Sequence, residues 1–95
     1  MRKYEVMYII RPDLEDGDRE ALIEKINRVF TENNSEVTNV DEWGTRELAY
    51  EIDKLRKGYY VVLNVKATPE AVSEFERVIN LQEDIIRYIM IKDPR

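Results

Sequence analysis

Long cationic side chains stand at the ends of apolar segments of this sequence and in one predicted hairpin, where they could meet phosphate groups. Arginine presents a planar fork of donors to phosphate, and lysine presents a point charge. Tyrosines near them could stack on unpaired nucleic-acid bases. Acidic residues are interleaved with these cations, so the residues alone also fit a solvated surface without a ligand. The cations are Arg2, Lys3, Arg46, Lys54, Arg56, Lys57, Lys66, Arg87 and Lys92, and the tyrosines are Tyr4, Tyr50, Tyr60 and Tyr88.

Other kinds of site chemistry find little support. The chain contains no cysteine and no histidine, which removes thiolate nucleophiles, disulfides and imidazole bases or ligands. Acidic pairs such as Glu15-Asp16 lack the glycine pattern of a calcium loop, and carboxylates at the start of a helix favour its dipole. The three glycines are isolated and form no phosphate cradle. We therefore predict a protein that is not an enzyme and that has no metal, no cofactor and no small-molecule substrate.

The formal net charge of −5 at pH 7 by itself argues against a nucleic-acid partner. The excess is local, because residues 13–36 hold eight acidic and three basic residues and the remainder of the chain holds twelve of each. A basic patch on another surface is therefore compatible with the composition.

Hydrophobic periodicity predicts four strands and two helices in the order strand, helix, strand, strand, helix, strand. Asp16 or Asp18 can cap the first helix, and Thr68 followed by Pro69 opens the second. This order predicts an α+β, ferredoxin-like βαββαβ fold, a four-stranded antiparallel sheet with two helices on one face. We expect the first and last strands, which are the most apolar, to be neighbours in the middle of the sheet. The predicted strands span 3–10, 37–52, 59–66 and 85–92, the helices run from about 16–18 to 33 and from 69 to about 81, and residues 93–95 form a frayed end.

A chain of 95 residues is long enough for one domain, which we expect to span 1–95. No apolar run approaches the ~20 residues of a membrane helix, and no signal-peptide pattern follows the first residues. We expect a cytoplasmic protein with no membrane partner.

The segment from Gly44 to Ile52 alternates apolar and polar residues, as a strand with one covered face does. Gly44 beside Trp43 indicates a bulge or bend. Residues 54–58 are expected to reverse the chain, which gives a long hairpin with a basic tip. Trp43 then stands at the bend, either as an interface anchor or at the rim of the core.

One face of the predicted sheet is left without a covering layer. If Val6, Tyr8 and Leu63 face the helices, the residues of the other parity face away from them. An apolar patch of this kind usually marks a protein interface, although protein surfaces are largely apolar in any case. The side chains expected there are Met7, Ile9, Tyr60, Val62, Ile89 and Ile91.

The run Gly44-Thr45-Arg46-Glu47-Leu48-Ala49-Tyr50-Glu51-Ile52 resembles the signature of the family of the sixth protein of the bacterial small ribosomal subunit. Residues 1–7 and 85–92 resemble that family too, and the resemblance covers nearly the whole chain. Asp53 departs from it, because the family more often has a basic or small polar residue there.

The resemblance implies a structural protein of the small ribosomal subunit that binds the central domain of 16S ribosomal RNA (rRNA) together with the eighteenth small-subunit protein. It implies a location on the ribosome and favours that protein as the partner on the uncovered face. Cations at strand ends would contact phosphates and groove shape rather than base edges. Without the resemblance, a non-ribosomal homodimer, a ligand-binding or regulatory module, or a small enzyme of ferredoxin-like fold stays open. The residues expected to bind RNA are Arg2, Lys3, Arg46, Arg87 and Lys92.

Overall fold

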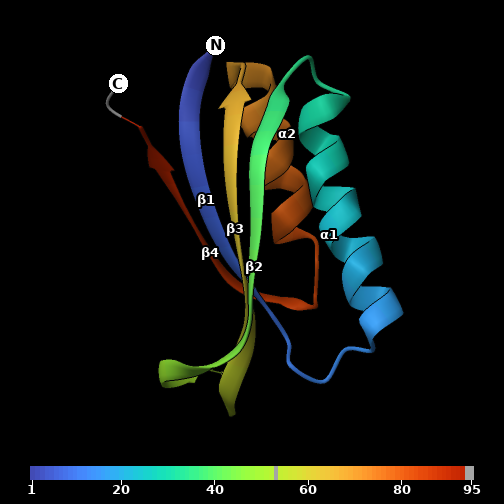
Figure 1. Ribbon diagram of the computed structural model, residues 1–95, viewed down its shortest axis with the longest axis vertical. Coiled ribbons are helices and arrows are strands. Elements are labelled where there is room, and N and C mark those ends of the chain that lie inside the picture. Colours follow the sequence, from blue (N-terminus) through green and yellow to red (C-terminus); the bar gives the residue numbers. More distant parts are fainter. Residues whose placement is uncertain (53, 94–95) are drawn as a thin grey trace.

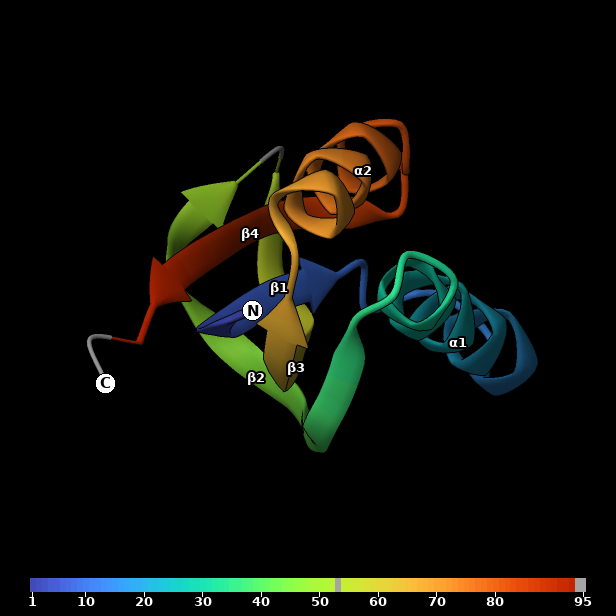
Figure 2. The same ribbon diagram turned by 90° about the horizontal axis from the view of Figure 1, so that it is seen from above.

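The computed structural model describes residues 1–52 and 54–93. Asp53 and the last two residues of the expected frayed end lie outside the described residues. Figure 1 shows a sheet with both helices packed on one side of it, and Figure 2 shows the same two layers from above. The predicted α+β, ferredoxin-like fold is confirmed. Its elements are β1 (Arg2–Ile10), α1 (Asp16–Thr31), β2 (Glu36–Ile52), β3 (Leu55–Ala67), α2 (Pro69–Asn80) and β4 (Ile85–Lys92).

The four strands lie in the order β2-β3-β1-β4, and every neighbouring pair is antiparallel. The first and last strands are neighbours, as predicted, but the prediction that both are central is wrong, because β4 is an edge strand and β3 is central. The apolar residues of β4 are therefore not explained by burial on both faces of the sheet. Ile89 and Ile91 are 45% and 57% exposed on the face without helices.

The core lies between the sheet and the two helices. Val6 and Tyr8 of β1 are fully buried, and Phe30 of α1 and Phe75 of α2 meet above them. The two phenylalanine rings stack with their centroids 5.1 Å apart, and Tyr88 of β4 approaches Phe75 edge-on at 5.8 Å. The residues at helical spacing therefore hold both helices on the same face of the sheet.

The two helices begin in different ways. Thr68 caps α2 as predicted, since its side-chain oxygen accepts a hydrogen bond from the amide of Ala71 at 3.1 Å. For α1 the predicted cap is wrong, because Glu15 occupies the capping position without a side-chain bond. Asp16 lies inside the first turn and pairs with Arg19 at 2.8 Å, where its charge still favours the helix dipole.

The β2–β3 hairpin reaches past the end of β1. The bend predicted at Gly44 is present, with a register shift between Glu42 and Gly44 and a φ of 86° at Gly44. The chain reversal predicted over residues 54–58 is wrong, since β3 already begins at Leu55 and Ile52 pairs with Leu55. A positive φ of 66° at Lys54 makes the turn this tight.

Candidate nucleic-acid interface

The face of the sheet turned away from the helices carries an apolar strip, which we define as Met7, Val62, Ile89 and Ile91. The register places Met7 between Val62 and Ile89, and Ile91 stands opposite Glu5 on the same face. Ile89 and Ile91 are exposed, and Met7 is half-buried. The expectation that these four side chains face away from the helices thus agrees with the structure. Val62 is buried at 9%, so the hydrophobic surface of the strip comes from Ile89, Ile91 and part of Met7.

Ile9, which was expected on the same face, is covered by the hairpin. It is only 6% exposed, and the backbone of Gly58 lies directly against it. A Cβ on Gly58 would overlap the Cγ2 atom of Ile9 and would lie 3.4 Å from Cδ2 of Leu48. The apolar strip therefore ends at Ile9, because the hairpin closes that end of the face.

An aromatic stack flanks the strip on its β2 side. The rings of Trp43 and Tyr60 are nearly parallel, with an interplanar angle of 10° and centroids 6.2 Å apart. The guanidinium carbon of Arg46 lies 4.9 Å from the Trp43 ring centroid, and the indole nitrogen donates to Oδ2 of Asp41 at 3.0 Å. Trp43 is 41% exposed on this face. Trp43 is thus a surface aromatic outside the core beneath the helices, and its role as an interface anchor stays a prediction.

Three of the five cations expected to bind RNA, Lys3, Arg46 and Arg87, lie on the open face, at its opposite ends. Lys3 stands opposite Lys66, and Arg87 stands opposite Ile9. Six positions along β1 separate these two rows, or roughly 20 Å at ~3.3 Å per residue. Arg46 pairs with Gly58 and shares the hairpin end with Arg87. The cations therefore form two groups and not one patch.

The remaining two cations, Arg2 and Lys92, occupy the alternate strand positions, whose side chains point to the helix side of the sheet. Arg2 is opposite the buried Ala67, and Lys92 is opposite Tyr4, which packs against the core. Both side chains therefore start on the helix side of the sheet, at the end where Lys3 is found. Since they lie at a strand end, they can reach a ligand that runs past this edge.

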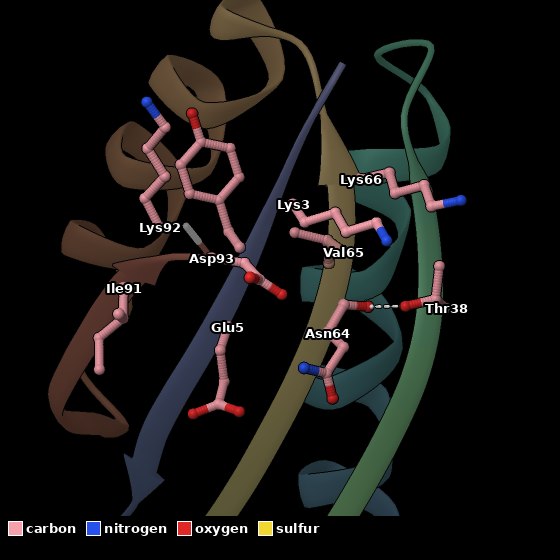
Figure 3. A pocket seen from close by; sticks show the side chains of 10 residues that line it. Lys3, Glu5, Thr38, Asn64, Val65, Lys66, Ile91, Lys92 and Asp93 are labelled. Carbon is pink, nitrogen blue, oxygen red and sulfur yellow. Dashed lines mark hydrogen bonds between the residues drawn. The ribbon is translucent and has the colours of Figure 1, made fainter. Parts of the chain in front are cut away.

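A pocket of about 550 Å³ opens at this end of the sheet, between the ends of β4, β1, β3 and β2 (Figure 3). Lys3 and Lys66 line it from adjacent strands, and like charges directly opposite each other in a ladder repel. Glu5 and Asp93 share the lining, and the amide of Asp93 donates to the carbonyl of Lys3 at 2.8 Å. An anion here would relieve the repulsion between the two ammonium groups.

Lys66 was one of the nine cations noted in the sequence but not one of the five expected to bind RNA, although it stands at the end of a predicted strand. Antiparallel pairing of residues 59–66 with 3–10 would have placed it beside Lys3. That pairing was the available signal.

Two tyrosines on the helix side of the sheet have pKa values raised above the ordinary value. Burial, and then the charge of Glu42, raises the pKa of the Tyr8 phenol. A hydrogen bond to the Glu42 carboxylate, at 2.8 Å, raises the pKa of Tyr59. Among residues 1–52 and 54–93, no group of three or more acidic side chains could hold a metal ion. Within the same residues, no helix is long and apolar enough to cross a membrane.

Comparison with known proteins identifies what the chain resembles. The family model described as "Ribosomal protein S6" matches residues 3–92. Among solved structures, the 30S ribosomal protein S6 from Thermotoga maritima is similar, with 30% sequence identity and a TM-score of 0.91. That match covers 97% of this chain and 87% of the other chain.

Proposed function

The chain belongs to the ribosomal protein S6 family, whose members are structural proteins of the small ribosomal subunit, and from this premise we propose its contacts. We propose that it binds the central domain of 16S rRNA jointly with the eighteenth small-subunit protein, on the ribosome in the cytoplasm. Cations at both ends of the open face would contact RNA phosphates, and the apolar strip would contact the protein partner.

The observation that carries this proposal is the open face itself. It combines exposed apolar side chains such as Ile89 and Ile91 with cations at each end, Lys3 and Arg87. A hydrophobic strip fits a protein surface, and cations at strand ends fit phosphates. The acidic helix α1 lies on the other side of the sheet (Figure 2), so its negative charge is directed away from this face.

The way the cations are presented indicates how RNA would be read. Within residues 1–52 and 54–93, no helix stands on the open face to enter a groove, and Lys3 and Arg87 project from strands. Their contacts would therefore be with phosphates and with the shape of the RNA, which carry little sequence information. The partner protein and the fold of the RNA would supply the remaining specificity.

The experiment is binding to a fragment of the central domain of 16S rRNA, with and without the eighteenth small-subunit protein, at two salt concentrations. We expect tight binding only with the partner present, and weaker binding at the higher salt, because phosphate contacts release counterions. No binding in either condition would refute the proposal. A stable dimer of this chain alone, measured by sedimentation, would favour the homodimer instead.

A pair of variants separates RNA contact from folding. Arg2→Ala combined with Arg87→Ala should weaken RNA assembly and lower the slope of log affinity against log salt by about two, while the melting temperature stays nearly constant. The matched control removes two cations from α1, Lys25→Ala with Arg28→Ala. An equal loss with the control would mean that overall charge, and not position, drives binding.

A further inference from the structure

The two edge strands of the sheet touch each other, although β2 and β4 stand at opposite ends of the strand order. The Nη1 atom of Arg87 in β4 donates a hydrogen bond to the phenolic oxygen of Tyr50 in β2. The guanidinium carbon of Arg87 also lies 5.5 Å from the centroid of the Tyr50 ring. Arg87 is thus held by a residue 37 positions away in sequence, from the far edge of the sheet.

The hairpin makes this contact possible because it is longer than the sheet beside it. β2 has 17 residues and β3 has 13, whereas β1 has nine. Tyr59 is the first residue of β3 that pairs with β1, and Gly58, on the hairpin side of it, packs against Ile9. In Figure 2 the end of β2 curls round beside β4. Arg87 stands opposite Ile9, so the curled hairpin brings Tyr50 to it.

Arg87 differs from other arginines of the chain in the kind of group that holds it. Arg19, Arg56 and Arg77 pair with the carboxylates of Asp16, Glu51 and Glu74. In the part of the chain that the structure describes, no carboxylate lies within salt-bridge distance of Arg87. The Tyr50 phenol is neutral, so it holds the guanidinium without cancelling its charge. Of the five N–H donors, the others are left for an acceptor such as phosphate.

We propose that Tyr50 is a positioning residue for the Arg87–RNA contact: it orients the guanidinium so that its remaining donors meet a phosphate. The inference rests on the proposed function, since it needs Arg87 to contact RNA. A flexible arginine loses rotamer freedom when it binds, and a side chain already held in place loses less. The expected gain in affinity is about two- to tenfold, which is the usual entropy of one immobilised side chain expressed as a ratio.

The tether has little effect on the stability of the fold. Tyr50 is 58% exposed and Arg87 is exposed too, and exposed polar contacts contribute little to folding. Removing the hydroxyl should therefore leave the midpoint of urea unfolding in place. This separates positioning from a structural role, in which RNA affinity and stability would fall together.

The test is a double-mutant cycle in RNA binding with the partner protein present. Its variants are Tyr50→Phe, Arg87→Ala and both together, with Tyr50→Leu removing the ring as well. We expect Tyr50→Phe to weaken binding about two- to tenfold and Tyr50→Leu to weaken it further. The double variant should bind no worse than Arg87→Ala alone, because Tyr50 acts only through Arg87.

The matched control is Tyr59→Phe, which removes an exposed phenolic hydrogen bond on the helix side of the sheet. It should leave RNA affinity unchanged. Wild-type affinity in Tyr50→Phe, or an equal loss from Tyr50→Phe with and without Arg87, would overturn the positioning role while RNA binding stands. If Arg87→Ala binds like the wild type, Arg87 meets no phosphate and the inference fails with that contact. If the wild type itself does not bind, the proposed function fails first.

Discussion

Removal of the Tyr8 hydroxyl should stabilise this protein. Tyr8 is fully buried in the middle of the sheet, and its hydroxyl has no hydrogen-bond partner among residues 1–52 and 54–93. A buried polar group without a partner costs about 1–3 kcal/mol. Tyr8→Phe removes that cost and leaves a void of one oxygen atom, which at ~24 cal/mol per Å³ costs roughly 0.5 kcal/mol. The expected net effect is about 1 kcal/mol of added stability.

Urea unfolding and calorimetry measure this change. For a chain of 95 residues, 1 kcal/mol raises Tm by about 4–8 °C. The control is Tyr59→Phe, whose hydroxyl donates to Oε1 of Glu42 at 2.8 Å. That variant should lose up to about 1 kcal/mol, because a hydrogen bond is removed. A loss of stability in Tyr8→Phe would refute the reasoning, since it would mean that the Tyr8 hydroxyl is hydrogen-bonded.

The same residue predicts a pH dependence. Burial, followed by the charge of Glu42, raises the pKa of Tyr8 above the ordinary value of about 10. Above pH ~10 the unfolded chain loses this proton and the folded chain keeps it, so the free energy of unfolding falls, by at most ~1.4 kcal/mol per pH unit. Below pH ~10 the hydroxyl is protonated in both states, so ionisation of Tyr8 takes nothing from the free energy of unfolding there. The advantage of Tyr8→Phe should therefore widen between pH 9 and 11, and a constant difference would contradict the burial argument.

Three further outcomes are expected. Thr68→Ala should lower the free energy of unfolding by about 1 kcal/mol because the cap of α2 is lost, whereas Thr68→Ser should keep most of it. Gly58→Ala should destabilise by about 1–3 kcal/mol because its Cβ overlaps Ile9; unchanged urea unfolding would contradict this close packing. Ile91→Ser should weaken binding of the protein partner in a pull-down, while Leu81→Ser should not, because Leu81 is exposed at the C-cap of α2, at 66% against 57% for Ile91.

Local patterns predicted most of the fold. The period-2 alternation placed Val6 and Leu63 toward the helices and Ile89 and Ile91 away from them, as the structure has them. Thr68 as a cap was predicted from the residue types alone. These features depend on neighbours in sequence, so they are visible without the tertiary structure.

The candidate site was only partly accessible in this way. Each cation could be located at a strand end or in the hairpin, but their division into two groups depends on strand register. The pairing of Lys3 with Lys66 joins residues 63 positions apart, so it follows from how two strands pair and not from a pattern local to either residue. The contacts of these side chains with RNA stay predictions.

The sequence by itself determined which segments form strands and helices, which side chains share a face, and the bend at Gly44. Only the tertiary structure decided that β4 is an edge, that the hairpin covers Ile9, and that Tyr50 holds Arg87. The physical reason is the sequence separation of the residues that interact. Secondary structure follows from backbone and side-chain preferences within a few residues, whereas strand order and cross-sheet contacts depend on how the whole chain packs.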